Sequence, residues 1–152
     1  MIQNQEPYKA WKSHKFNACA IRYEVASNIQ TGDVVWFNGP FMPGIYNDIT
    51  IFREGLKQKL EKEGEKAEAD LGYRGEPDTI RHPRDYKSWS DRKAKAYVRM
   101  RHETINRRFK QFKILSDKFR HDVRKHESVF RAVLVLTQIG FDIGEKPFDC
   151  NY

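Results

Sequence analysis

Cysteine is scarce in this 152-residue chain, which contains only Cys19 and Cys150. The two are far apart and form no Cys-x-x-Cys pair, so the sequence predicts free thiols in a reducing compartment. The five histidines show no zinc-ligand spacing with them. Long apolar runs are also lacking. The longest, VFRAVLVLTQIGF, is interrupted by Arg131 and falls short of the roughly 18 residues that a membrane span needs. No apolar segment of a secretory signal follows Met1.

Acidic residues are outnumbered, with 21 Asp and Glu against 28 Lys and Arg, which gives a formal net charge of +7. The excess is local, because residues 84–131 hold 16 basic and 6 acidic residues. A basic block within a folded domain favours a polyanionic partner, most simply nucleic acid. A solvated helical surface explains the same charges equally well, so charge alone leaves both interpretations open.

The first half of the chain carries the pattern of a β-hairpin followed by a helix. Residues 17–29 alternate between apolar and polar side chains, and a QTGD turn separates them from the β-forming run at 34–37. A helix is expected over 49–64, with Asn47 or Asp48 as its N-cap and Gly64 at its end.

The second half alternates short strands with longer helices. Strands are expected over 65–73 and 78–82, and a long helix over 90–115. A last helix over 121–139 is apolar on most sides toward its end, so its second half is expected to be buried and Gly140 to stop it. The order predicts one α/β domain over 1–152, with a short mixed sheet packed by helices.

The long helix carries two neighbouring stripes within VRMRHETINRRFKQF. One stripe is charged and is formed by Arg99, Glu103, Arg107 and Lys110. The other is apolar, would face the core, and is formed by Val98, Ile105, Phe109 and Phe112. Glu103 is therefore expected at the edge of the buried face. The ordinary interpretation is a solvated helix with ion pairs worth about 0.2–0.5 kcal/mol each.

Asp70 favours a functional interpretation of these residues over a solvated helix. It ends the segment AEAD, which has the pattern of a buried strand, and a charge there is costly to desolvate without a partner or a metal. Together, Asp70 and Glu103 would offer the oxygen ligands that Mg²⁺ or Mn²⁺ takes. Paired ions of this kind activate a nucleophile and stabilise the leaving oxygen at a phosphate, while nearby Arg and Lys hold the nucleic-acid backbone.

At these residues the sequence resembles the Harbinger-type endonuclease domain of the DDE-superfamily transposases. ADLGY is similar to the strand-end motif that carries the family's second catalytic Asp, here Asp70. Arg99, Glu103 and Lys110 are similar to an Arg-Glu-Lys signature that carries the third acidic residue, with Tyr97 matching the family's tyrosine. Upstream, the segments QEPYKAWKSHKF, IRYEVASNIQTGDVVWFNGPF and DITIFREGL resemble its early strand, hairpin and first helix. The similarity covers nearly the whole chain.

The resemblance implies an RNase H-like fold and metal-dependent cutting of DNA ends, followed by strand transfer. It implies Mg²⁺ or Mn²⁺ as cofactor, DNA as partner, a nuclear location in a eukaryote and a separate sequence-specific DNA-binding protein. Asp70 and Glu103 would be catalytic and would bind metal. Asp48 is a further metal candidate, although a role as helix N-cap explains it at least as well. The residues expected to contact DNA are Arg99, Arg107, Arg108, Lys110 and Lys113.

One family feature has no counterpart in this sequence. The family's first catalytic Asp precedes the position matched by Gln5-Glu6-Pro7, where this chain has none, and its first Asp is Asp33 in a turn. The sequence thus predicts an incomplete opening strand and a truncated, weakened enzyme, because a lost metal ligand removes transition-state stabilisation. Two alternatives stay open: a non-catalytic basic DNA-binding module, and a transposase relic without activity.

Overall fold

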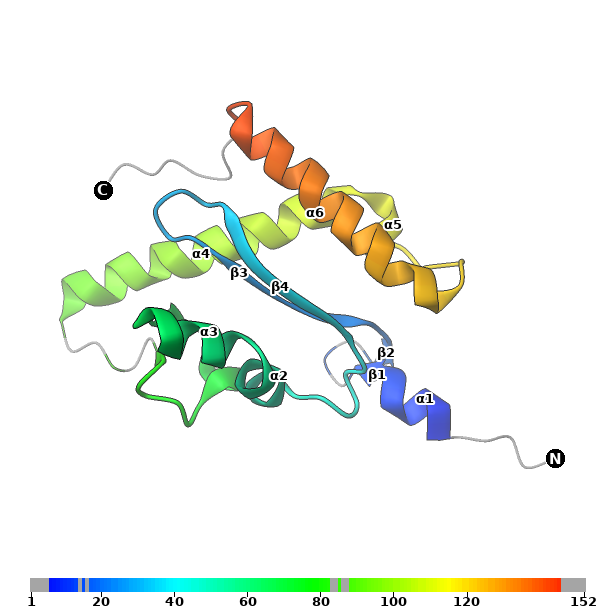
Figure 1. The fold of residues 1–152 in the computed structure, drawn as a ribbon, viewed down its shortest axis with the longest axis horizontal. Coiled ribbons are helices and arrows are strands. Elements are labelled where there is room, and N and C mark those ends of the chain that lie inside the picture. Colours follow the sequence, from blue (N-terminus) through cyan, green and yellow to red (C-terminus); the bar gives the residue numbers. More distant parts are fainter. Residues whose placement is uncertain (1–5, 14, 16, 83–84, 86–87, 146–152) are drawn as a thin grey trace. The chain divides into compact units, whose positions relative to one another are not determined.

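A computed structural model describes residues 6–13, 15, 17–82, 85 and 88–145 (Figure 1). It is a mixed α/β structure in which short sheets are packed by helices. The chain divides into two compact units. Unit 1 comprises Met1–Glu24 and Phe37–Tyr86, and unit 2 comprises Val25–Trp36 and Lys87–Tyr152. No helix among the described residues is both long and apolar enough to cross a membrane.

Unit 1 is built from short elements. Its helices are α1 (Glu6–Trp11), α2 (Asp48–Glu54), α3 (Leu56–Glu63) and the 3-10 turn η1 (Leu71–Tyr73). Its short strands are β1 (Lys12–Ser13), β2 (Ala18–Cys19), β5 (Ala67–Glu68) and β6 (Ile80–Arg81). β1 pairs antiparallel with β2, and β5 pairs parallel with β6. Cys19 is a free, exposed thiol, as predicted, whereas Cys150 lies outside the described residues.

The helix expected over 49–64 is two helices with a break at Gly55. Asn47 is the N-cap of α2, and its Oδ1 accepts hydrogen bonds from the Thr50 backbone N–H and hydroxyl. Gly55 leaves the helical conformation (φ −136°, ψ −92°), which ends α2 and begins α3. The break turns α3 without exposing its apolar side. The buried side chains of the unit 1 core are Ile51, Phe52, Leu56, Leu60 and Ile80.

The expected hairpin is present as β3 (Arg22–Ser27) and β4 (Val34–Phe41), and it contributes residues to both units. In its turn, the Asn28 side-chain oxygen accepts hydrogen bonds from the N–H groups of the two residues at the tip. β4 is twice as long as expected because it continues through Gly39. A Cβ at Gly39 would lie 2.7 Å from the Tyr23 ring, and φ there is +135°, so only glycine fits.

Unit 2 has two long helices, α4 (Trp89–Gln111) and α6 (His126–Asp142), with α5 (Lys113–Ser116) and η3 (Val123–Lys125) between them (Figure 1). Its core cluster is formed by Ile105 and Phe109, which the apolar stripe of α4 predicted, together with Val133 of α6. The long helix ends before the expected Leu115, because Phe112 takes an extended conformation that separates α4 from α5.

The end of α6 corrects one expectation. Its second half is buried on one side only, through Val133, Thr137 and Phe141, and the helix continues through Gly140 to Asp142. On the opposite side Leu136 is 54% exposed. The prediction was wrong because apolar residues around the whole helix need two partner surfaces, and the described part of unit 2 provides one.

Candidate functional site

Two carboxylates converge in unit 1, at the start of α2 and the start of η1. Asp48 is the first residue of α2, and Asp70 is the N-cap of η1, where its Oδ1 accepts a hydrogen bond from the Gly72 N–H at 2.8 Å. A Cβ built on Gly72 would lie 3.0 Å from Oδ1 of Asp70 and 3.1 Å from Oδ2 of Asp48. The two carboxylate oxygens therefore lie close to Gly72 and no more than 6.1 Å from each other, the sum of those two distances. We call them the acidic pair.

Local packing fixes this arrangement. Asn47, rather than Asp48, is the N-cap, so the Asp48 carboxylate is available for other contacts at the positive end of the helix. η1 packs against α2 through Tyr73, whose ring meets that of Phe52 edge to face at 5.9 Å between centroids. The acidic pair is thus held by a helix cap, a turn and an aromatic contact.

β3 brings a cation and a third carboxylate to the same region. Nη1 of Arg22 lies 3.1 Å from Oδ1 of Asp48 and donates a hydrogen bond to the Tyr46 carbonyl at 2.7 Å. Glu24, two residues further along β3, is only 4% exposed. The pattern that could have identified Arg22 and Glu24 is their i, i+2 spacing, which puts both side chains on one face of a strand.

The pKa of Tyr73 depends on all of these charges. Its burial raises the pKa of the phenol, and the negative charges of Glu24, Asp48 and Asp70 raise it further, whereas Arg22 opposes them. The phenol is therefore a neutral group at any physiological pH. Its surroundings carry a net negative potential that would attract a cation.

The acidic pair fits a hard divalent cation in chemistry. Mg²⁺ is commonly held by one or two carboxylates together with water and substrate phosphates. The pair supplies two such oxygens beside Gly72. No group of three or more His, Cys, Asp or Glu side chains among the described residues is arranged to hold a metal ion. A cation here would therefore need water or phosphate for its other ligands.

Asp70 differs from its expected setting. Its side chain is exposed, and the segment Ala67–Ala69 before it is only half-buried, so its charge needs no partner against desolvation. The sequence pattern was wrong on this point because Asp70 begins a turn instead of ending a buried strand. Its neighbouring carboxylate in unit 1 is that of Asp48, the residue that sequence reasoning ranked lower.

Glu103 lies on α4 in unit 2 and is exposed. Its expected place at the rim of the buried face is consistent with Ile105 and Phe109, which are buried nearby on the same helix. The pairing of Glu103 with Asp70 stays a prediction, since the two residues belong to different units.

The expected DNA contacts lie along α4 and α5. Arg107, Lys110 and Lys113 are exposed, and Arg108 is half-buried. None of these four takes part in an ion pair with another described side chain. The side chains of Arg99 and Tyr97 lie outside the described residues. Sequence reasoning missed Arg101, which donates a hydrogen bond to the Ile29 carbonyl at 2.7 Å and ties α4 to the hairpin turn.

Basic residues are unevenly divided between the units. Unit 2 holds 16 of the 28 Lys and Arg residues and 9 of the 21 Asp and Glu residues, and unit 1 holds 12 of each sign. The whole net charge of +7 therefore belongs to unit 2. A surface of this kind is suited to an extended polyanion.

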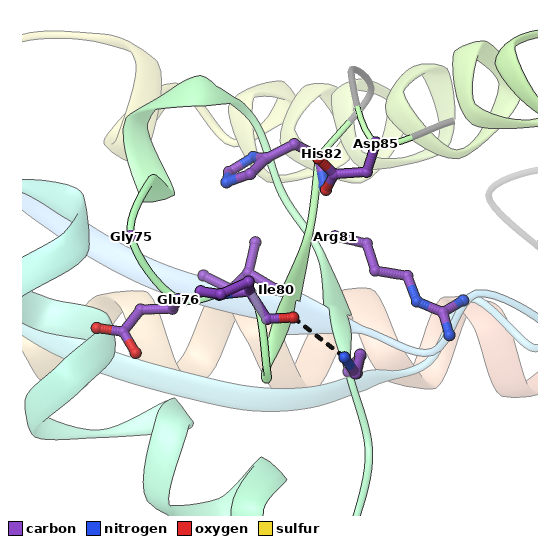
Figure 2. Close-up of a pocket in the computed structure, with 8 residues that line it drawn as sticks. Gly75, Glu76, Ile80, Arg81, His82 and Asp85 are labelled. Atoms are coloured by element: carbon purple, nitrogen blue, oxygen red, sulfur yellow. Dashed lines mark hydrogen bonds between the residues drawn. The ribbon is translucent and has the colours of Figure 1, made fainter. Parts of the chain in front are cut away.

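A pocket of about 400 Å³ also lies in unit 1, beside β6. Figure 2 shows His82 and Asp85 at its wall, with the Glu76 and Arg81 side chains pointing in opposite directions. Glu76 is bound by Arg53 at 2.6 Å and by Lys57 at 2.8 Å, which hold its pKa below the ordinary value. Glu76 is thus held by its two cations, whereas the ring nitrogens of His82 are buried without a hydrogen-bond partner among the described residues. We place the candidate site at the acidic pair, because Asp70 belongs to the motif found in the sequence.

Comparisons with known proteins add no further constraint. No family model, curated protein or solved structure matches the chain.

Proposed function

We propose that this chain is a divalent-metal-dependent DNA-cleaving domain of the Harbinger-type DDE transposase class, with an RNase H-like fold. The observation that carries the proposal is the proximity of the Asp48 and Asp70 carboxylates beside Gly72, because Asp70 stands in the motif that resembles the family's second catalytic position. Glu103 is proposed as a further catalytic and metal-binding residue on its motif alone.

Asp70 and Asp48 would hold Mg²⁺ or Mn²⁺ with one carboxylate oxygen each. The ion, when bound, would supply Lewis acidity at a DNA phosphate and lower the pKa of a bound water. Arg22 holds the Asp48 carboxylate in place through its ion pair, and the Gly72 N–H does the same for Asp70. Arg107, Arg108, Lys110 and Lys113 would bind the DNA backbone, with Arg99 as a further candidate from its motif. In a eukaryote the domain would act in the nucleus, and target choice would come from a separate sequence-specific DNA-binding protein.

Metal binding is tested by Mn²⁺ titration followed by electron paramagnetic resonance, alongside nicking of supercoiled plasmid. We expect Asp70→Asn and Asp48→Asn each to weaken Mn²⁺ binding at least about tenfold and to lower any nicking about 100-fold or more. Gly72→Ala should also weaken binding, since its methyl group would stand between the two carboxylates.

Asp78→Asn is the matched control, because Asp78 is an exposed carboxylate of the same unit. Equal Mn²⁺ affinity in the wild type, the Asp70 variant and the control would refute the metal site. Binding without nicking would refute only the catalytic half of the proposal.

A second function, a non-catalytic DNA-binding module, is favoured by the location of the whole net charge in unit 2. Affinity for a DNA duplex should fall with salt, and each lost phosphate contact should reduce the log–log slope by about 0.9. Arg107→Gln, Lys110→Gln and Lys113→Gln should each lower that slope. Lys62→Gln, an exposed lysine of unit 1, should leave it unchanged. A slope that none of the three variants alters would contradict this DNA surface.

A further inference from the structure

α6 has two apolar sides, and the described residues of unit 2 cover only one of them. The covered side includes Phe130, Val133 and Phe141, with the Phe130 ring against Phe109 at 5.7 Å between centroids. Gln138 also ties the helix to the hairpin, since it accepts a hydrogen bond from the Val34 N–H and donates one to Asp33. This side explains why α6 is part of the unit 2 core.

The other side is an apolar stripe open to solvent, which we call the α6 stripe. It is formed by Ala132, Val135, Leu136, Ile139 and Ile143. Val135 and Leu136 are 54% exposed, and Ile143 is 75% exposed. The residues recur at intervals of three and four, so they lie on one face over about three turns. Contiguous exposed apolar side chains of this kind are typical of an interaction surface.

The charges beside the stripe indicate what covers it. By their spacing on the helix, Arg131 and Asp142 lie on the same flank, eleven residues or about three turns apart, one near each end of the stripe. When two copies of α6 pack antiparallel about a two-fold axis, Arg131 of one copy stands beside Asp142 of the other, twice. Arg131 already meets Glu127 of its own helix at 2.8 Å, so the carboxylate of a second copy would extend an existing ion pair.

We propose that the α6 stripe is a homodimer interface in which two copies of this chain pair antiparallel through α6. The stripe is then self-complementary, as a two-fold interface requires, and the opposed helix dipoles favour the same orientation. A parallel two-fold pairing would instead place the Arg131 flanks of the two copies on opposite sides of the interface, where neither Arg131 could reach an Asp142 of the other copy. The interface is independent of the acidic pair, so it does not depend on the proposed catalytic function.

The primary test is sedimentation velocity of the full chain, whose monomer mass is 18.0 kDa. We expect a reversible dimer at micromolar concentration. Leu136→Glu should raise the dissociation constant at least about 100-fold, because each dimer loses two buried leucines. Met100→Glu is the matched control, since Met100 is a 58% exposed apolar residue on α4, and it should leave association unchanged.

Charge exchange tests the orientation. Arg131→Glu and Asp142→Arg should each weaken the dimer by about tenfold, since each creates two like-charge contacts. The double variant, which exchanges both charges within one chain, should restore the wild-type affinity. Far-UV circular dichroism of every variant checks that α6 is intact.

Three results would overturn the proposal. A wild-type chain that stays monomeric at about 100 µM, well above the micromolar range in which the dimer is expected, would refute the interface. A dimer insensitive to Leu136→Glu would place the contact elsewhere. Failure of the double charge variant to recover would refute the antiparallel arrangement.

Discussion

The two units use charge in opposite ways. In unit 1, acidic and basic residues are equal in number, and several are bound to one another, as in the Arg22–Asp48 and Arg53–Glu76 pairs. In unit 2, basic residues are in excess, and the exposed Arg107, Lys110 and Lys113 form no ion pair with the other described side chains.

This difference shows which charges have a structural role. Ion pairs in unit 1 fix the positions of carboxylates, so their value lies in geometry more than in free energy, since exposed pairs contribute little to stability. In unit 2 the apolar core of Ile105, Phe109 and Val133 holds the fold together, and the charges on the long helices do not. We therefore expect these charges to act in contacts with other molecules.

The largest expected effect on stability comes from a substitution that disrupts the core of one unit and leaves the core of the other unit intact. Phe109 is 5% exposed and packs against Phe130, so Phe109→Ala should lower the free energy of unfolding by about 3–5 kcal/mol. Urea denaturation measures the loss, and amide hydrogen exchange shows where it falls. We expect faster exchange in α4 and α6 than in α2 and α3.

Phe52→Ala is the reciprocal variant, because Phe52 is 1% exposed in the core of unit 1. It should destabilise by a similar amount and accelerate exchange in α2 and η1. If both variants accelerated exchange equally in all four helices, the chain would unfold as one cooperative body, and the comparison of two units would not apply to stability.

A smaller effect is expected at the cap that positions the acidic pair. Asn47→Ala removes both hydrogen bonds to Thr50 and should cost about 1 kcal/mol of stability. Because Asp48 begins the same helix, Mn²⁺ affinity should fall with it. Asn47→Asp keeps a capping oxygen and should restore stability. A variant whose affinity falls with no loss of stability would show that Asn47 acts on the site directly instead of through the helix.

Several elements were predictable because local signals decide them. The hairpin followed from alternation and a QTGD turn, and the start of α2 from Asn47 as a capping residue. The core face of α4 followed from the 3.6-residue spacing of Ile105 and Phe109. In each case the residues that determine the structure lie within one or two turns of one another.

The rest depends on contacts that no local pattern contains. Gly55 divides one expected helix into two, although a single interior glycine is often tolerated. Asp70 was expected in a buried strand because AEAD is apolar at every second position, but its turn hydrogen bond to Gly72 prevails. The neighbourhood of Asp48 and Asp70 comes from η1 packing on α2, which brings together residues 22 positions apart. Only tertiary packing determines that contact.

The smallest effects on stability are expected from changes in pH, and the two units should respond in different pH ranges. In unit 1, Lys57 and Arg53 hold the pKa of Glu76 below its ordinary 4.5. This group stabilises the fold above pH 4.5, and that contribution is lost as the pH falls through the lower folded-state pKa. Glu76→Gln should therefore flatten the acid limb of a stability profile measured below pH 4.5. An unchanged limb would show that other carboxylates determine it.

In unit 2 the corresponding group is His126, which is 9% exposed and packs edge to face on Phe119 at 4.7 Å between centroids. Burial lowers its pKa from 6.5, so the unfolded chain binds a proton at a higher pH than the folded chain does. Stability therefore falls as the pH drops below 6.5, with a slope of at most about 1.4 kcal/mol per pH unit for one proton. His126→Gln should remove that slope between pH 5 and 6.5, a range in which Glu76 keeps its charge. If the pH dependence of stability persisted in this variant, another histidine would be its cause. The comparison of the two units by their response to acid would then fail.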